Sequence, residues 1–290
     1  MIVVLSLYRP RLEDFLAKRG KKILAVIPDS MRPAREATNP GYPIRTIDQW
    51  DNYNELARLA GEFECLGVTA VATIDEPCIR AAAFLRDLLG LPGQDHESAV
   101  ACTDKSVMKR RLAAARIPVA EHRVVHSVAQ IREFLDEVGD DIVVKPRCGF
   151  GTINTHRVSR DNFDELAAAG AFAAPRDLPE YFRSTTMTSD LGRVSYLVER
   201  YVDVAEYHCE MLLHEGSEVH CLAGRYSNPI LSHHAAGSVL LDPNSPRRPE
   251  CADSPAPPRR RWDHASGTAR SFGTDRGGGW WASSVPAQAV

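Results

Sequence analysis

The strongest indication of the fold is the stretch Val143-Val144-Lys145-Pro146-Arg147-Cys148-Gly149-Phe150-Gly151-Thr152. Its apolar start predicts a buried β-strand that ends in a lysine. Glycines at 149 and 151 let backbone N–H groups approach an anion closely, and the Thr152 hydroxyl is a further donor. Lysine supplies a point charge for phosphate oxygens. The stretch therefore predicts a phosphate-binding strand and loop, although an ordinary strand and turn with a surface lysine has the same short pattern.

Three further motifs flank this strand in the expected order. Asp104-Lys105, followed by Lys109, lies on a helix predicted from Ala99 to Ala115, and the two lysines share one helix face. The stretch Val198-Glu199-Arg200-Tyr201-Val202 reads as a strand, and Val204-Ala205-Glu206 follows it. Together the four motifs resemble the ATP-grasp superfamily, over roughly residues 1 to 242.

The resemblance implies a nucleotide site. Lys105 and Lys145 would contact the α- and β-phosphates of ATP, and the loop containing Gly149, Gly151 and Thr152 would close over the γ-phosphate. Mg²⁺ would accompany the nucleotide, and the family reaction joins a carboxylate to an amine through an acylphosphate. The protein's part in such a transfer is mainly positioning and charge neutralisation.

The resemblance also places the base and the sugar. Main-chain groups of Glu199 and Val202 would meet the adenine edge, and Glu206 would accept the ribose hydroxyls, since a carboxylate takes two donors at once. Val204 stands where the family has glycine. Arg225, after a predicted strand, is a candidate contact for a substrate carboxylate, and a rim arginine is the equal alternative.

The predicted fold is α/β with a second, α+β part. Alternating strands and helices predict a Rossmann-like domain over residues 1–97. An ATP-grasp region, with two antiparallel sheets that clasp ATP, follows over residues 98–243. Pro28 to Tyr42 reads as a loop. Residues 244–290 hold no Leu, Ile or Met and are rich in Pro, Arg, Gly and Ser, a composition that predicts a disordered tail.

Composition narrows the remaining classes. A net charge of -3 and the lack of a basic field argue against nucleic acid as a partner. No apolar run is long enough for a membrane span, and seven scattered cysteines without metal spacing indicate reduced thiols in a cytoplasm. The adjacent pair His233-His234 points to opposite sides of an extended chain, so metal binding by both is disfavoured.

No metal-ligand set is predicted, because the tail lacks the acidic strand and the Glu-x-x-Arg-Pro-Gly-Gly-like segment that hold magnesium in the family. Read from the last base of the Trp280 codon, the shifted frame can encode such a segment. We therefore hypothesise that the chain is a C-terminally truncated or frameshifted form of an ATP-grasp protein, with impaired phosphoryl transfer.

Two other functions stay open. A biotin-carboxylase-like enzyme would use bicarbonate as the carboxylate, and a non-catalytic nucleotide-binding protein would need no metal site. The sequence identifies neither the carboxylate nor the amine, and it leaves the activity of this chain open. The oligomeric state is open as well, with a homodimer as the candidate.

Overall fold

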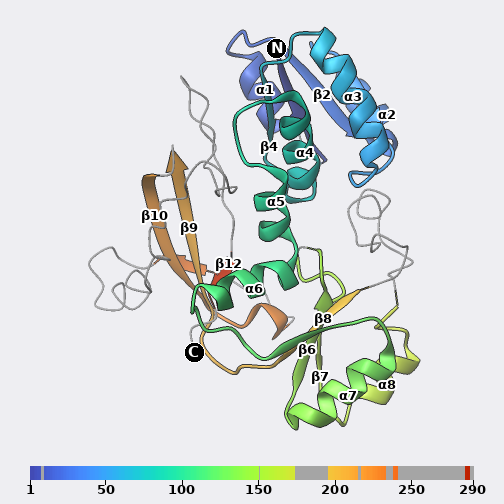
Figure 1. The fold of residues 1–290 in the computed structure, drawn as a ribbon, viewed down its shortest axis with the longest axis vertical. Coiled ribbons are helices and arrows are strands. Elements are labelled where there is room, and N and C mark those ends of the chain that lie inside the picture. The colour runs from blue at the N-terminus through green and yellow to red at the C-terminus, as the bar shows by residue number, and fades with distance from the viewer. Residues whose placement is uncertain are drawn as a thin grey trace.

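The computed structural model describes residues 1–7, 10–149, 151–173, 195–214, 217–232, 238–240 and 285–287. Within these ranges the strands form three four-stranded sheets, each built from its own stretch of the chain. Figure 1 shows the N-terminal sheet at the top and the other two below it, with α5 and α6 running between them. Among the described helices none is long and apolar enough to cross a membrane.

The first sheet is entirely parallel, as the alternation of strands and helices predicts. Its strand order is β3-β2-β1-β4. Apolar strand residues such as Val3, Leu24 and Val71 pack with Leu56 and Phe63 of α3 into one buried core. The strands are β1 (Ile2–Leu5), β2 (Ile23–Pro28), β3 (Ile44–Ile47) and β4 (Ala70–Thr73), and the helices are α1 (Arg11–Ala17), α2 (Arg32–Glu36), α3 (Tyr53–Cys65) and α4 (Ile79–Leu89). Two 3₁₀ turns, η1 (Asp29–Met31) and η2 (Glu76–Cys78), follow β2 and β4.

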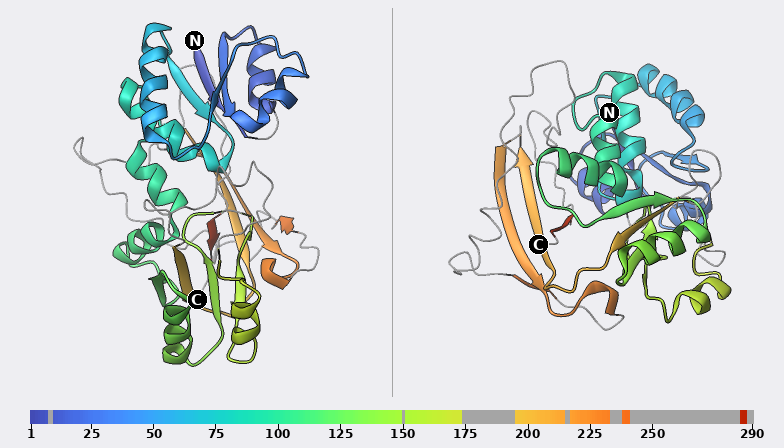
Figure 2. Two further views of the ribbon diagram at one scale, coloured as in Figure 1. Left: turned by 90° about the vertical axis from the view of Figure 1, so that its right-hand side faces the viewer. Right: turned by 60° about the horizontal axis from the view of Figure 1, so that its bottom comes forward.

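The second sheet is antiparallel, in the order β5-β8-β6-β7. One of its faces is covered by two helices, as both views in Figure 2 allow the reader to follow. The core beneath them contains Val144, Val198 and Phe134. The elements are β5 (His122–Val125), α7 (Val128–Val138), β6 (Ile142–Pro146), β7 (His156–Val158), α8 (Phe163–Ala168) and β8 (Tyr196–Arg200).

The third sheet has the order β11-β10-β9-β12 and is also antiparallel. Its centre is the hairpin that the alternating residues after Tyr207 predict. The strands are β9 (Tyr207–His214), β10 (Ser217–Tyr226), β11 (Ser238–Leu240) and β12 (Val285–Ala287), with the 3₁₀ turn η3 (Ile230–Ser232) after β10. Strand β12 gives three residues of the predicted tail a place beside β9, whereas the rest of residues 244–290 and His233-His234 lie outside the described residues.

Two sequence expectations need correction. The helix expected from Ala99 to Ala115 is two helices, α5 (His96–Thr103) and α6 (Lys105–Ala114), because the Asp104 backbone is extended and its carboxylate caps α6. The segment Pro28 to Tyr42 is not all loop, since it contains α2. Pro33 there occupies the first turn of the helix, where proline's missing N–H costs nothing.

Candidate nucleotide-binding site

The face of the second sheet opposite α7 and α8 carries charged side chains and is approached by α6. Val144 and Val198 point to the core under α7 and α8. Neighbouring residues along a strand point to opposite faces, so Lys145 and Glu199 share the other face. In the register of β6 and β8, Lys145 lies opposite Leu197 and Glu199 lies opposite Val143. The alternation thus separates a core face from a charged face.

On this face Glu199 joins two lysines from different elements. Its Oε2 lies 2.7 Å from Nζ of Lys109 on α6, and its Oε1 accepts a hydrogen bond from Nζ of Lys145 on β6. The exposed fractions are 1% for the Glu199 side chain, 8% for Lys109 and 20% for Lys145. Burial alone would raise the pKa of Glu199, but the charges of Lys145 and Lys109 lower it below its ordinary value.

Lys105 joins the same cluster from the first turn of α6. Its Nζ donates to the carbonyl oxygen of Gly149 at 2.6 Å. Burial lowers the pKa of Lys105, and the nearby charge of Lys145 lowers it further, against the raising effects of Glu76, Cys148 and Glu199. Desolvation in turn raises the pKa of Glu76, in η2, even though part of its side chain is open to solvent.

Asp104 fixes the start of α6 against the loop that follows β6. Its buried carboxylate accepts hydrogen bonds from the backbone N–H groups of Ser106 and Val107, which caps the helix. The same carboxylate accepts Nε of Arg147 at 2.7 Å. The Lys105 N–H donates to the Arg147 carbonyl at 3.0 Å. Two segments that carry predicted site residues are thereby held together.

The loop after β6 uses backbone conformations that favour glycine. Gly151 has φ 63°, and Thr152 and Asn154 also have positive φ, 59° and 54°. Positive φ is a rare state for a β-branched residue such as Thr152. The Thr152 hydroxyl donates to the Gly151 carbonyl at 2.6 Å. Gly149 on this loop contacts Lys105, and Gly151 and Thr152 follow it along the chain, whereas Phe150 lies outside the described residues.

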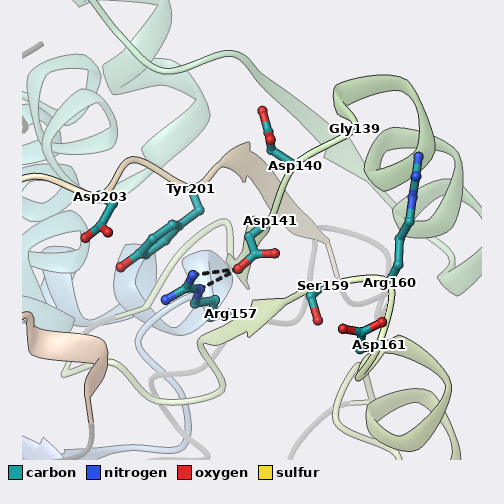
Figure 3. A pocket seen from close by; sticks show the side chains of 9 residues that line it. All are labelled: Gly139, Asp140, Asp141, Arg157, Ser159, Arg160, Asp161, Tyr201 and Asp203. Carbon is teal, nitrogen blue, oxygen red and sulfur yellow. Dashed lines mark hydrogen bonds and ion pairs between the residues drawn. The ribbon is translucent and has the colours of Figure 1, made fainter.

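A hollow of about 400 Å³ lies on the second sheet at the end away from Lys145 (Figure 3). In it the Arg157 guanidinium stacks on the Tyr201 ring, with 3.9 Å from Cζ to the ring centroid, and pairs with Asp141 at 2.7 Å. In the register of β6 and β7, Arg157 lies opposite Val143 and hence on the charged face of the sheet. The lining residues are Gly139, Asp140, Asp141, Arg157, Ser159, Arg160, Asp161, Tyr201 and Asp203.

The other predicted residues lie apart from the lysine cluster. Val202 follows β8 between two residues of the hollow. Glu206 precedes β9, and its Oε2 accepts the Ile230 N–H at 2.9 Å, so one carboxylate oxygen already has a protein partner. Arg225 is exposed on β10, opposite Tyr207 and Val239, and no contact among the described residues joins it to the lysines.

The described part of the chain contains no set of side chains that could bind magnesium. No group of three or more His, Cys, Asp or Glu side chains there could hold a metal ion. Of the carboxylates around this cluster, Glu199 is committed to lysine partners and Asp104 to arginine partners. The described residues alone therefore do not fit a magnesium site, and the expectation that the chain supplies no metal ligands stays a prediction.

Sequence reasoning missed the side-chain role of Glu199 and the partner of Lys109. The signal was present as a glutamate inside an otherwise apolar strand, at a position that alternates with the core residue Val198. Arg147 was quoted as part of the loop motif without a role, and its pairing with Asp104 depends on tertiary structure that no local pattern reveals.

The chain is similar to known proteins in sequence and in fold. The chain is 28% identical over 179 residues to the L-arginine-specific L-amino acid ligase of Bacillus subtilis, which covers 61% of this chain and 40% of that ligase. The crystal structure of an L-amino acid ligase from Bacillus licheniformis superposes with a TM-score of 0.60 at 18% identity, covering 79% of this chain and 53% of that one. No family model matches.

A third similarity is to the biotin carboxylase domain of the Hydrogenobacter thermophilus 2-oxoglutarate carboxylase. Its TM-score is 0.53 at 15% identity, over 78% of this chain and 49% of that one. The chain spans less than half the length of the curated relatives that it matches. The described part of the chain therefore has the fold of these enzymes, and its sequence is similar to that of an L-amino acid ligase over 179 residues.

Proposed function

We propose that this chain binds ATP on the charged face of the second sheet and derives from an enzyme that joins a carboxylate to an amine. The observation that carries the proposal is the convergence of Lys105, Lys109 and Lys145 beside the glycine loop. Three ammonium groups outnumber the two carboxylates near them, Glu199 and Glu76, so the cluster has excess positive charge for an anion. A triphosphate supplies that anion.

The remaining contacts follow the direction of the strands. The phosphates lie at Lys105, Lys145 and the loop of Gly149, Gly151 and Thr152. The base lies toward Val202, with main-chain contacts from Glu199 and Val202. The hollow beside Val202 leaves space at that end of the face. The free oxygen of Glu206 meets the ribose, and Arg225 remains a candidate contact for a substrate carboxylate.

In the reaction, the carboxylate attacks the γ-phosphate of ATP, ADP leaves, and an amine displaces phosphate from the acylphosphate. This chain's residues contribute binding and charge neutralisation through the lysines. Mg²⁺ supplies further neutralisation when it is bound with ATP. Because the described residues do not fit a magnesium site, we propose weak turnover for this chain and derive no step from the metal.

Two relatives are named as L-amino acid ligases, so L-amino acids are the first carboxylates and amines to test. The experiment measures phosphate release by the purified chain with MgATP and pairs of L-amino acids. Amino-acid-dependent release above the ATP-only rate supports ligation. Release that depends on bicarbonate instead supports the carboxylase alternative, for which the third similarity is the specific observation.

ATP binding without release under any amine would leave the chain a nucleotide-binding protein. We also propose that the protein lies in a cytoplasm and forms a homodimer. The biotin carboxylase domain of Hydrogenobacter thermophilus, whose fold is similar, forms a dimer in its crystal structure. Sedimentation of the purified chain measures its oligomeric state.

A further inference from the structure

Two ion pairs on Glu199 connect the helix that carries Lys105 to the strand that carries Lys145. Lys109 reaches Glu199 from α6, and Lys145 reaches it from β6. One carboxylate therefore spans the two elements from which the phosphate-binding lysines come. A side chain 1% exposed cannot exchange these partners for water without opening the sheet face.

The burial of the three side chains gives them an order. Lys109 is almost as buried as Glu199, so this pair is fixed inside the protein. Lys145 is more open, with 20% of its side chain exposed. Lys109 thus anchors Glu199, and Glu199 orients Lys145. A lysine has a flexible stem and loses rotamer freedom when a ligand fixes it, so a preset ammonium group favours binding.

We propose that Glu199 is a positioning residue of the nucleotide site, whose side chain, anchored by Lys109, holds the Lys145 ammonium in place for the phosphates of ATP. This inference rests on the proposed ATP binding. It gives the Glu199 side chain a role separate from the main-chain contact with adenine. It also gives Lys109 a role behind the site instead of on the ligand.

Glu199 also acts on Lys105 through its charge. Four ionisable groups from the surrounding elements face Lys105: Glu76 from η2, Lys145 from β6, Cys148 from the loop and Glu199 from β8. Burial and Lys145 lower the pKa of Lys105, while Glu199 raises it. Removal of the Glu199 charge would move the Lys105 pKa further down. ATP binding would then weaken at a lower pH than in the wild-type protein.

The test compares ATP affinity with stability in the full chain, by calorimetric titration from pH 7 to 10 and by thermal unfolding. Glu199→Gln removes the charge but keeps the shape. We expect about tenfold to hundredfold weaker ATP binding, as for loss of a charged hydrogen bond, and a binding midpoint shifted to lower pH. Glu13→Gln, which breaks the buried pair with Arg35 in the first domain, is the matched control and should lower stability without changing ATP affinity.

A double variant separates positioning from stability. Glu199→Met with Lys109→Met replaces the buried pair by apolar side chains of similar length, which is often neutral or stabilising. We expect wild-type stability with ATP binding still weakened at least tenfold. Recovery of wild-type affinity along with stability would show a merely structural pair and overturn the inference, as would wild-type affinity and an unchanged pH midpoint in Glu199→Gln. A wild-type chain that binds no ATP would instead overturn the proposed function itself.

Discussion

The Arg147 guanidinium and the Asp104 carboxylate form an ion pair, with 2.6 Å between Nη2 and Oδ2, that joins the loop after β6 to the start of α6. Arg80 of α4 approaches the same oxygen at 3.8 Å and donates to the Cys148 sulfur at 3.2 Å. The glycine loop after β6 is therefore tied both to α6 and to α4. Asp104 is the common partner of the two arginines.

Asp104→Asn should lower the free energy of unfolding and make that free energy depend less on pH in the acid range. Burial would raise the pKa of Asp104, but Arg147 and the two capping N–H groups lower it overall. A lowered carboxyl pKa contributes stability that is complete above the ordinary value of 3.8 and is lost as pH falls through the lower folded value. We expect a loss of about 1 to 3 kcal/mol at pH 7. Urea unfolding of both proteins at pH 7 and pH 3 measures it, and an equal difference at the two pH values would contradict the account.

ATP binding should weaken at alkaline pH because Lys105 loses its charge early. Its pKa is lowered by burial and by Lys145, so the ammonium loses its proton as pH rises through a value below the ordinary 10.5. Lys105→Arg keeps a charge over this range. Titrations with ATP at pH 7 and pH 10 should show a fall in affinity for the wild-type chain and a smaller fall for the arginine variant. Parallel falls in the two proteins would count against the role of Lys105.

Gly151→Ala and Gly61→Ala should change stability in opposite directions. At both positions an added Cβ meets nothing within 4 Å, so packing does not decide the result. Gly151 has φ +63°, where alanine is strained by about 1 to 2 kcal/mol. Gly61 lies inside α3, where alanine stabilises by about 0.5 to 1 kcal/mol. Thermal unfolding of both variants measures the signs, and a stabilised Gly151→Ala protein would mean that the loop lacks this conformation.

The third sheet offers a test of its own register. Gly224 lies opposite His208, and a Cβ at residue 224 would stand 2.2 Å from the His208 Nε2. Gly224→Ala should therefore cost about 1 to 3 kcal/mol through overpacking. Adding His208→Ala should recover part of this loss. A double-mutant cycle by urea unfolding tests the contact, and additive effects of the two changes would show that the residues do not touch.

The sequence predicts the part of the site that is encoded locally. An apolar run ending in Lys145 before a glycine loop specifies its own strand and turn, and Gly90 ends α4 at the residue where a left-handed glycine is expected. The break between α5 and α6 could not be predicted in this way. Helix formers continue on both sides of Asp104, and the residue becomes a cap only because Arg147 and the loop lie against it.

The pairing of Lys109 with Glu199 shows the same limit. Helical spacing puts Lys105 and Lys109 on one face, but only the arrangement of α6 over the second sheet gives each lysine a different partner. Residues 174–194 and most of residues 241–290 lie outside the described residues. The frameshift hypothesis and the predicted extents of the three domains therefore remain predictions.

Phosphate binding by Lys105 and Lys145 is the proposal on which the other expectations about ATP depend. The most direct measurement is calorimetric titration of ATP, with Mg²⁺ in the buffer, into the full chain and into the Lys105→Met/Lys145→Met variant, with Lys22→Met as an exposed-lysine control. We expect the wild-type and Lys22→Met proteins to bind ATP. The double variant should bind ATP at least about hundredfold more weakly, because it has lost two charged contacts. Equal affinity in all three proteins, or no binding by the wild-type chain, would contradict it.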